Sequence, residues 1–149
     1  MSNRFGVWPW IIAVVLISIG AFQVFRVNRP LREKPLTEQV RYTYGPVVNG
    51  PITIEPRSYL AFKIELNRRT DLAGNFRTAA RSESVAARVM SADEFELWRN
   101  GSEYKHISQT GYIPGGKISL VLDPGAYYLI FDNLHSDKPQ TIEANFEVE

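Results

Sequence analysis

Apolar and polar residues alternate regularly in two segments of the chain. In YLAFKIEL (residues 59–66) and TIEANFEVE (residues 141–149), one set of alternate positions is wholly apolar. A period of two is typical of a β-strand with one face in a core and the other toward water. Both segments are therefore expected to be strands of an antiparallel sheet.

Shorter apolar runs bounded by turn residues predict further strands. The candidates are Pro51–Glu55, Phe76–Ala80, Ser84–Met90, Tyr104–Thr110, Lys117–Leu122 and Ala126–Asp132. About seven or eight short strands, roughly ten residues apart and without a long helical pattern between them, are typical of a sandwich. The chain is therefore predicted to be all-β, with an antiparallel, jelly-roll-like β-sandwich over residues 51–149.

One strand differs from the others in its pattern. Residues 127–131 (YYLIF) place apolar side chains on both faces, which predicts a central strand covered on both sides. A tight structural turn is expected just before it, at Asp123, Pro124 and Gly125. Proline presets φ for such a turn, glycine permits positive φ, and an aspartate can accept nearby backbone N–H groups.

A single short helix is predicted within SADEFELWRNG (residues 91–101). Ser91 as N-cap and Glu94 three residues later form a capping box, and the following Asn-Gly pair ends the helix. Phe95 and Trp98 share a face and are expected to pack on the sheet. Trp98 is thus expected to be a hydrophobic lid, with ligand stacking as the alternative.

The beginning of the chain holds 21 consecutive uncharged residues, FGVWPWIIAVVLISIGAFQVF. A helix of this length spans roughly 30 Å, the thickness of a bilayer core. A single transmembrane helix with a short tail is therefore predicted over residues 1–27, which makes the lipid bilayer a partner. The expected membrane-interface anchors are Trp8, Trp10, Arg26 and Arg29.

A cleaved signal peptide is the alternative for this segment. Small residues at positions 18–20 would suit cleavage, but the apolar run is longer than that of a usual signal peptide. The chain is therefore expected to be a single-pass protein of the inner (cytoplasmic) membrane. The basic residues after the run favour a cytoplasmic domain, but the N-terminal tail is too short to determine the orientation.

Charge is distributed unevenly along the chain. The net charge is +1 overall, which divides into +4 over residues 1–34 and −3 over residues 35–149. An acidic folded part argues against a nucleic-acid partner, which needs a concentrated basic face. Residues 28–50 are basic near the membrane and contain several prolines, so they are expected to form an extended linker.

Sites for chemistry are not evident in the sequence. The chain has no cysteine, which excludes thiol catalysis and zinc–thiolate sites. A calcium site from Asp132, Asn133 and Asp137 is an alternative, but its ligands lack the dense spacing of a calcium loop. His106 and His135 belong to no recognisable nucleophile–base–acid set. No catalytic residue, cofactor or metal is therefore expected, and the protein is predicted not to be an enzyme.

An arginine-rich stretch is the one notable surface feature. NRRTDLAGNFRTAARSESVAAR (residues 67–88) is interpreted first as a solvated loop and hairpin. The alternative is a docking surface, because guanidinium groups pair well with carboxylate and phosphate. The candidate partner-docking residues are Arg68, Arg69, Arg77, Arg81 and Trp98.

The residues from 93 to 133 carry a resemblance to a known group. An acidic–aromatic helix ending in LWRNGSEYK, a turn at PGGK and the strand pair in ISLVLDPGAYYLIFDN resemble small bacterial extracytoplasmic β-sandwich modules comparable to the emp24/GOLD group. The resemblance covers residues 51–149 and implies a non-catalytic domain for protein interaction on a membrane anchor. It favours a periplasmic or extracytoplasmic domain. The emp24 proteins have a C-terminal anchor and disulfides, so their cargo-receptor function is not carried over.

These expectations predict a role for the whole chain. It is expected to be a non-catalytic accessory or scaffolding subunit of a multisubunit membrane complex, an energy-transducing one among the candidates, that docks through its helix and sandwich. The alternative is a free-standing anchored binding module for glycan or peptide. That module would present exposed aromatic residues near Trp98, Tyr104 and Tyr112.

Overall fold

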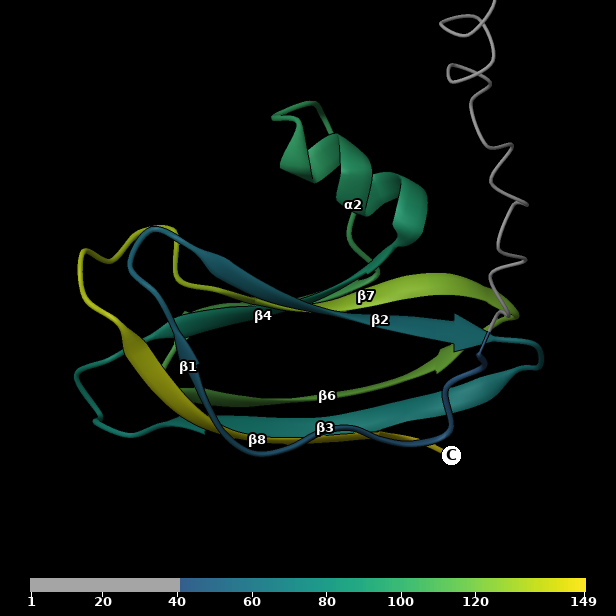
Figure 1. Ribbon diagram of the computed structural model, residues 1–149, viewed down its shortest axis with the longest axis horizontal. Coiled ribbons are helices and arrows are strands. Elements are labelled where there is room, and N and C mark those ends of the chain that lie inside the picture. Colours follow the sequence, from purple (N-terminus) through teal and green to yellow (C-terminus); the bar gives the residue numbers. More distant parts are fainter. Residues whose placement is uncertain (1–40) are drawn as a thin grey trace, which may run out of the picture. The chain divides into compact units, whose positions relative to one another are not determined.

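The computed structural model describes residues 41–149. This part of the chain folds into strands with one short helix between the fourth and fifth of them (Figure 1). The strands are β1 (Gly45–Ile54), β2 (Tyr59–Leu66), β3 (Thr70–Thr78), β4 (Val85–Ser91), β5 (Ser108–Ile113), β6 (Gly115–Leu122), β7 (Gly125–Asp132) and β8 (Gln140–Val148). The helix is α2 (Ala92–Arg99).

The strands form two four-stranded antiparallel sheets packed face to face. The first sheet, called sheet A below, has the order β1-β8-β3-β6, and the second, sheet B, has the order β2-β7-β4-β5. Except for β4 and β5, consecutive strands lie in different sheets, as in a jelly roll. The predicted all-β, jelly-roll-like sandwich with one short helix is confirmed.

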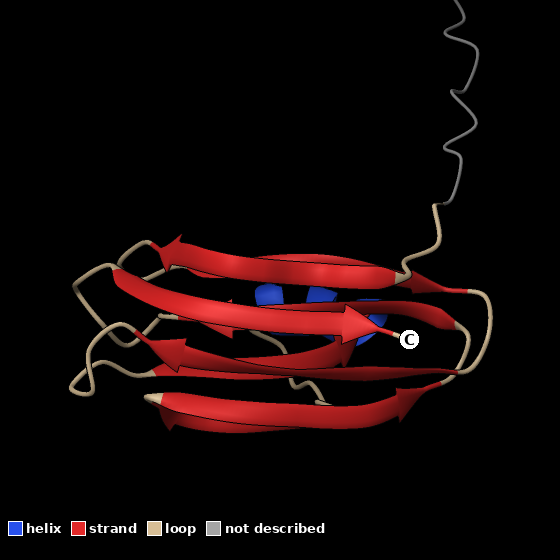
Figure 2. Cartoon of the chain, turned by 90° about the horizontal axis from the view of Figure 1, so that it is seen from below, coloured by secondary structure: helices blue, strands red, loops and turns tan. Residues whose placement is uncertain are grey.

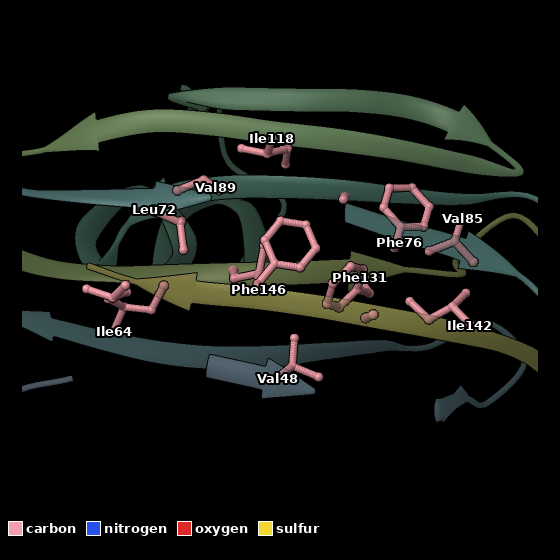
Figure 3. Close-up of a cluster of buried hydrophobic side chains, with 14 of the residues drawn as sticks. Val48, Ile64, Leu72, Phe76, Val85, Val89, Ile118, Phe131, Ile142 and Phe146 are labelled. Atoms are coloured by element: carbon pink, nitrogen blue, oxygen red, sulfur yellow. The ribbon is translucent and has the colours of Figure 1, made fainter. Parts of the chain in front are cut away.

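The core lies between the two sheets and is filled by alternate side chains of both (Figure 3). Its aromatic centre is Phe131 on β7, whose ring makes edge-on contacts with Phe62, Phe76 and Phe146 at centroid distances of 6.1, 5.8 and 5.7 Å. Such edge-to-face contacts add to the stabilisation from burial. The period-two pattern in β2 and β8 therefore correctly predicted which side chains of these strands face the core.

A second, smaller cluster lies on the opposite face of sheet B, where α2 covers the strands. Phe95 of α2 stacks on Tyr128 with a ring-centroid distance of 4.1 Å, and Met90 and Ile130 are fully buried beside them. Strand β7 therefore has the core on one face and the helix on the other. Its two apolar faces had predicted this central position.

The helix begins as predicted, but only half of the capping box forms. The Ser91 hydroxyl accepts the Glu94 N–H at 3.4 Å. The Glu94 carboxylate does not return to Ser91; it accepts the N–H of Lys105 at 2.6 Å. This contact ties the loop after the helix to its first turn, and a bond to a charged acceptor is stronger than a neutral one.

Three strands differ from their predicted limits, two of them because proline or glycine obscures the apolar pattern. Strand β1 begins at Gly45, within the predicted linker 28–50, and it contains two prolines that an edge strand tolerates. Strand β3 begins at Thr70 rather than Phe76, and Gly74 interrupts its apolar pattern. Strand β5 is displaced to Ser108–Ile113, since Ser102–Lys105 belongs to the loop after α2.

The segment Asp123-Pro124-Gly125 is a connection between sheets. It links β6 in sheet A to β7 in sheet B, so the strands that it joins do not form a hairpin. Gly125 has φ = 157°, a conformation that residues with a side chain rarely adopt.

The predicted membrane helix lies outside the described residues, as do its anchors Trp8, Trp10, Arg26 and Arg29. Within residues 41–149, no helix has the length and apolar character needed to cross a membrane.

Candidate functional site

The strongest concentration of polar chemistry is a buried ion pair on the face of sheet B that α2 partly covers. Arg88 of β4 and Asp132 at the end of β7 are diagonal neighbours, because Ala86 lies opposite Asp132 in the register. The Arg88 Nη2 atom is 2.8 Å from Asp132 Oδ2, and the two side chains are 11% and 0% exposed. Asp132 Oδ2 has no donor in hydrogen-bonding geometry, so the contact at this oxygen is chiefly electrostatic.

Two tyrosines complete this cluster of Arg88, Asp132, Tyr104 and Tyr112, called the Arg88–Asp132 cluster below. The Tyr112 hydroxyl donates to Asp132 Oδ1 at 2.9 Å, and the Leu134 N–H donates to the same oxygen at 2.8 Å. Arg88 Nη1 donates to the Tyr104 hydroxyl at 3.0 Å. Three neighbours thus contact the carboxylate: two donors hydrogen-bond its Oδ1 atom, and Arg88 supplies the opposite charge that a buried carboxylate needs.

The protonation of Tyr112 follows from this environment. Burial, followed by the hydrogen bond to Asp132, raises the pKa of Tyr112 to about 12, while the charge of Arg88 acts in the opposite direction. At neutral pH the phenol is therefore a hydrogen-bond donor and not a base. Tyr112 therefore holds its proton firmly, which suits a structural role.

His135 lies beside the cluster in an arrangement that resembles a nucleophile–base pair. Its Nε2 atom is 3.3 Å from the Ser84 hydroxyl, and its ring lies 4.0 Å from the Tyr112 ring between centroids. Within residues 41–149, no carboxylate hydrogen-bonds to His135 or pairs with it. A base without an orienting acid lacks the third member of a catalytic set. His106 is exposed on the loop before β5.

The aromatic residues proposed for ligand stacking are brought together around the same cluster. Trp98 packs on Tyr59 with a centroid distance of 4.8 Å, and the Arg88 guanidinium lies 5.8 Å from the Trp98 ring centroid. Trp98 and Tyr104 are half-buried in this packing, and Tyr112 is 40% exposed. Trp98 therefore acts as a lid on the sheet, and no row of exposed rings forms there among the described residues.

The four docking arginines are divided between the two ends of β3. Arg68 and Arg69 lie in the β2–β3 connection, whereas Arg77 and Arg81 lie at and beyond the other end of the strand. Eight residues of extended strand separate the two pairs by roughly 26 Å. Arg68 lies over the Tyr44 ring at 4.7 Å, and Arg69 Nε is 3.8 Å from the Asp123 carboxylate. Closeness in sequence therefore does not produce one arginine surface.

Asp123 has a different role from the predicted one. Its side chain is exposed and faces Arg69, and its backbone carbonyl accepts the Tyr127 hydroxyl at 3.0 Å. Burial, followed by the charge of Asp123, raises the pKa of Tyr127. Within the described part of the chain, the Asp123 carboxylate accepts no backbone N–H.

The three residues considered for calcium have separate partners. Asp132 is bound in the Arg88–Asp132 cluster, and Asp137 forms an exposed pair with Arg57 at 2.7 Å. This contact lowers the pKa of Asp137. Asn133 is fully buried, and its Nδ2 donates to the backbone carbonyls of Ile54, Glu55 and Lys138. Residues 41–149 contain no group of three or more histidine or acidic side chains placed to hold a metal ion.

The outer face of sheet A is the surface that no other part of the described domain covers. Figure 2 shows this sheet from below, with its strands in front and the helix behind them. Asn49, Asn145, Asn75 and Lys117 lie opposite one another on the four successive strands and form one exposed row across the sheet. A hollow of about 470 Å³ lies over this row, which is called the amide row below.

Sequence reasoning missed both the Arg88–Asp132 pair and the amide row. A signal for the pair existed, because Arg88 interrupts the apolar run VAARVM and Asp132 ends the apolar run YYLIF. Opposite charges within two buried strands indicate mutual pairing. The amide row had no such signal, since its members come from four strands whose register only the fold establishes.

Similarity to known proteins is found among solved structures. No family model matches the chain, and no curated protein matches it. Among solved structures, the chain is similar to the pre-peptidase C-terminal domain of collagenase from Bacillus anthracis, with a TM-score of 0.46 and 9% identity over 68% of this chain and 90% of that one. It is also similar to the Yersinia pseudotuberculosis-derived mitogen, with a TM-score of 0.46 and 11% identity over 66% and 82% of the two chains.

Neither similarity carries an argument about function. Neither structure is an emp24 or GOLD domain, so the resemblance to that group stays a prediction.

Proposed function

We propose that the chain is a non-catalytic, single-pass membrane protein that serves as an accessory or scaffolding subunit of a membrane complex. Its sandwich docks on another subunit through the outer face of sheet A. The bilayer segment is residues 1–27, and the sandwich lies on the extracytoplasmic side, as the resemblance to anchored bacterial modules implies.

The uncovered face of sheet A is the observation that carries this proposal. The outer face of sheet B is covered in part by α2 and closed by the Arg88–Asp132 cluster. Sheet A instead exposes the amide row and its hollow. Asparagine side chains offer both donors and acceptors, so an aligned row can bind polar groups of a partner without a large hydrophobic area.

The membrane part of the proposal has its support in the sequence. The uncharged run before Arg26 is long enough to span a bilayer, and tryptophans and arginines mark its two ends.

The test is purification of the full-length chain from native membranes in a mild detergent through a C-terminal tag, followed by mass spectrometry. We expect partners in stoichiometric amounts that survive washing. Asn145→Lys, in the middle of the amide row, should remove them, because its long side chain fills the hollow and displaces the polar contacts to a partner.

The matched control is Gln109→Lys, which adds the same charge at an exposed strand position of sheet B. It should retain the partners. Recovery of the wild-type chain alone would contradict the subunit role. Equal retention of partners by both variants would show that the interface is not on the outer face of sheet A.

A further inference from the structure

The edge of sheet A formed by β6 is open for backbone pairing. Of the described strands, β3 alone pairs with β6, in a continuous register from Thr70–Leu122 to Arg77–Gly115. The backbone groups of β6 that point away from β3 therefore have no strand partner. Open edges of this kind accept an additional strand from another chain.

The opposite edge of the same sheet is protected. Strand β1 contains Pro46 and Pro51, which lack a backbone N–H, and its register with β8 shifts after Pro46. Strand β6 contains no proline and begins with two glycines, Gly115 and Gly116. Prolines and irregular register are devices that prevent edge pairing, so their absence makes β6 the available edge of sheet A.

A hollow of about 880 Å³ with a basic lining, called the basic hollow below, lies where the start of β6 pairs with the end of β3. Its charged lining residues are Arg77, Arg81 and Lys117, and no carboxylate lines it. Lys117 is the diagonal neighbour of Arg77 on the outer face, because Arg77 lies opposite Gly115. Such neighbours lie about 7–8 Å apart, close enough to bind one acidic segment together.

The three cations are unpaired within residues 41–149, which distinguishes them from most other basic groups of the domain. Ion pairs occupy Arg57, Lys63, Arg69, Arg88 and Arg99. Glu143 lies opposite Arg77 on β8 without forming an ion pair with it. Glu83, near Arg81 in the chain, accepts the Ala80 N–H at 3.3 Å.

We infer that the basic hollow and the β6 edge together bind an extended acidic peptide segment of the partner, an inference that rests on the proposed function. The segment pairs with β6 as an additional strand of sheet A. Its carboxylates, on alternate residues, face Arg77, Arg81 and Lys117. Backbone pairing supplies affinity, and the alternating charges select the sequence.

The test uses the full-length chain in detergent and a fluorescent synthetic peptide of alternating glutamate and threonine, with binding measured by fluorescence anisotropy. The triple variant R77Q/R81Q/K117Q should bind roughly tenfold more weakly, since three exposed charge pairs are lost. Binding of the wild type should weaken as salt is added. A peptide with lysine in place of glutamate should not bind.

The matched control is R41Q/K105Q/K138Q, which removes the same charge from exposed positions outside the basic hollow. It should bind the peptide within about twofold of the wild type, because distant exposed charges are screened.

Two methylated peptides test the strand pairing itself. In one every glutamate amide is N-methylated, and in the other every threonine amide is. Alternate amides point to the same edge of a strand, so one peptide should lose binding and the other should keep it.

Unchanged binding by the R77Q/R81Q/K117Q variant would overturn the inference, as would equal binding of both methylated peptides. Binding to vesicles that contain anionic lipid would also overturn the inference, if the R77Q/R81Q/K117Q variant loses that binding and the acidic peptide does not bind. Co-purification of partners is independent of these results. Loss of peptide binding with retained partners therefore rejects this inference alone. Peptide binding without co-purifying partners rejects the subunit role and leaves an acidic-peptide site with no partner subunit.

Discussion

At the scale of single residues, the domain shows how a buried charge is accommodated. Asp132 is fully buried; Arg88 pairs with its charge, and Tyr112 and the Leu134 N–H donate hydrogen bonds to its Oδ1 atom. Removal of one partner leaves the other charge buried without compensation, which costs more than the pair contributes when intact. Loss of the cation should therefore destabilise the domain far more at a buried ion pair than at an exposed one.

Arg88→Met should lower the free energy of unfolding by about 3 kcal/mol, because Asp132 is left buried without its cation. Arg99→Met is the matched control, since Arg99 pairs with Glu96 on the exposed surface of α2. It should cost at most about 0.5 kcal/mol. Urea denaturation of both variants measures this, and similar losses would contradict the structural role of the Arg88–Asp132 cluster.

The raised pKa of Tyr112 predicts how stability depends on alkaline pH. The folded protein retains the phenolic proton to a pKa of about 12, whereas the unfolded chain releases it near pH 10. The stabilisation from Tyr112 is therefore complete below pH 10 and is lost between pH 10 and about 12. In Tyr112→Phe this contribution is absent, so the loss of stability over that pH range should be smaller than in the wild type.

Thermal unfolding between pH 8 and 12 tests this prediction, with Tyr42→Phe as the control because Tyr42 is an exposed tyrosine at 46%. Parallel curves of stability against pH for the wild type and Tyr112→Phe would show that folding does not change the pKa of Tyr112.

At the scale of secondary-structure elements, contact between strands β3 and β8 requires a glycine. Gly74 faces the core, and a methyl group there would overlap the Phe146 ring and the Asn145 carbonyl oxygen. The same glycine interrupts the apolar pattern of β3 in the sequence. Gly74 thus obscures the strand in the sequence because the packing of β3 against Phe146 requires a residue without a side chain.

Gly74→Ala should destabilise the domain by about 1–3 kcal/mol through overpacking. Phe146→Ala should be destabilising alone but removes the ring atoms Cγ and Cδ1 that the methyl group would meet, so the double variant should lose less stability than the sum of the two single changes. Chemical denaturation of the three variants measures the coupling. Strict additivity of the stability losses would show that positions 74 and 146 contribute to stability independently of each other.

At the scale of the whole molecule, the described domain and the first forty residues are expected to have separate tasks. Residues 41–149 form a compact unit with its own core, so they should fold without the preceding segment. The full-length chain should float with membranes after an alkaline carbonate wash, and a 41–149 fragment should stay in the soluble fraction. Cooperative unfolding of the fragment is the control that shows it is folded. Release of the full-length chain by the wash would contradict the predicted membrane helix.

The sequence by itself determined those features whose causes are local. Period-two alternation identified β2 and β8, two apolar faces identified β7 as a central strand, and Ser91 marked the start of the helix. Each depends on side chains within about ten residues, which share one environment once the strand or helix forms.

Only the tertiary structure decided the features that join distant segments. It placed β6 and β7 in different sheets, paired Arg88 with Asp132, and separated the predicted arginine surface into two ends of β3. The amide row and the basic hollow likewise depend on which strands become neighbours and in which register. Register is determined by the packing of the whole core, and a shift of one residue would exchange the buried face of a strand with its exposed face.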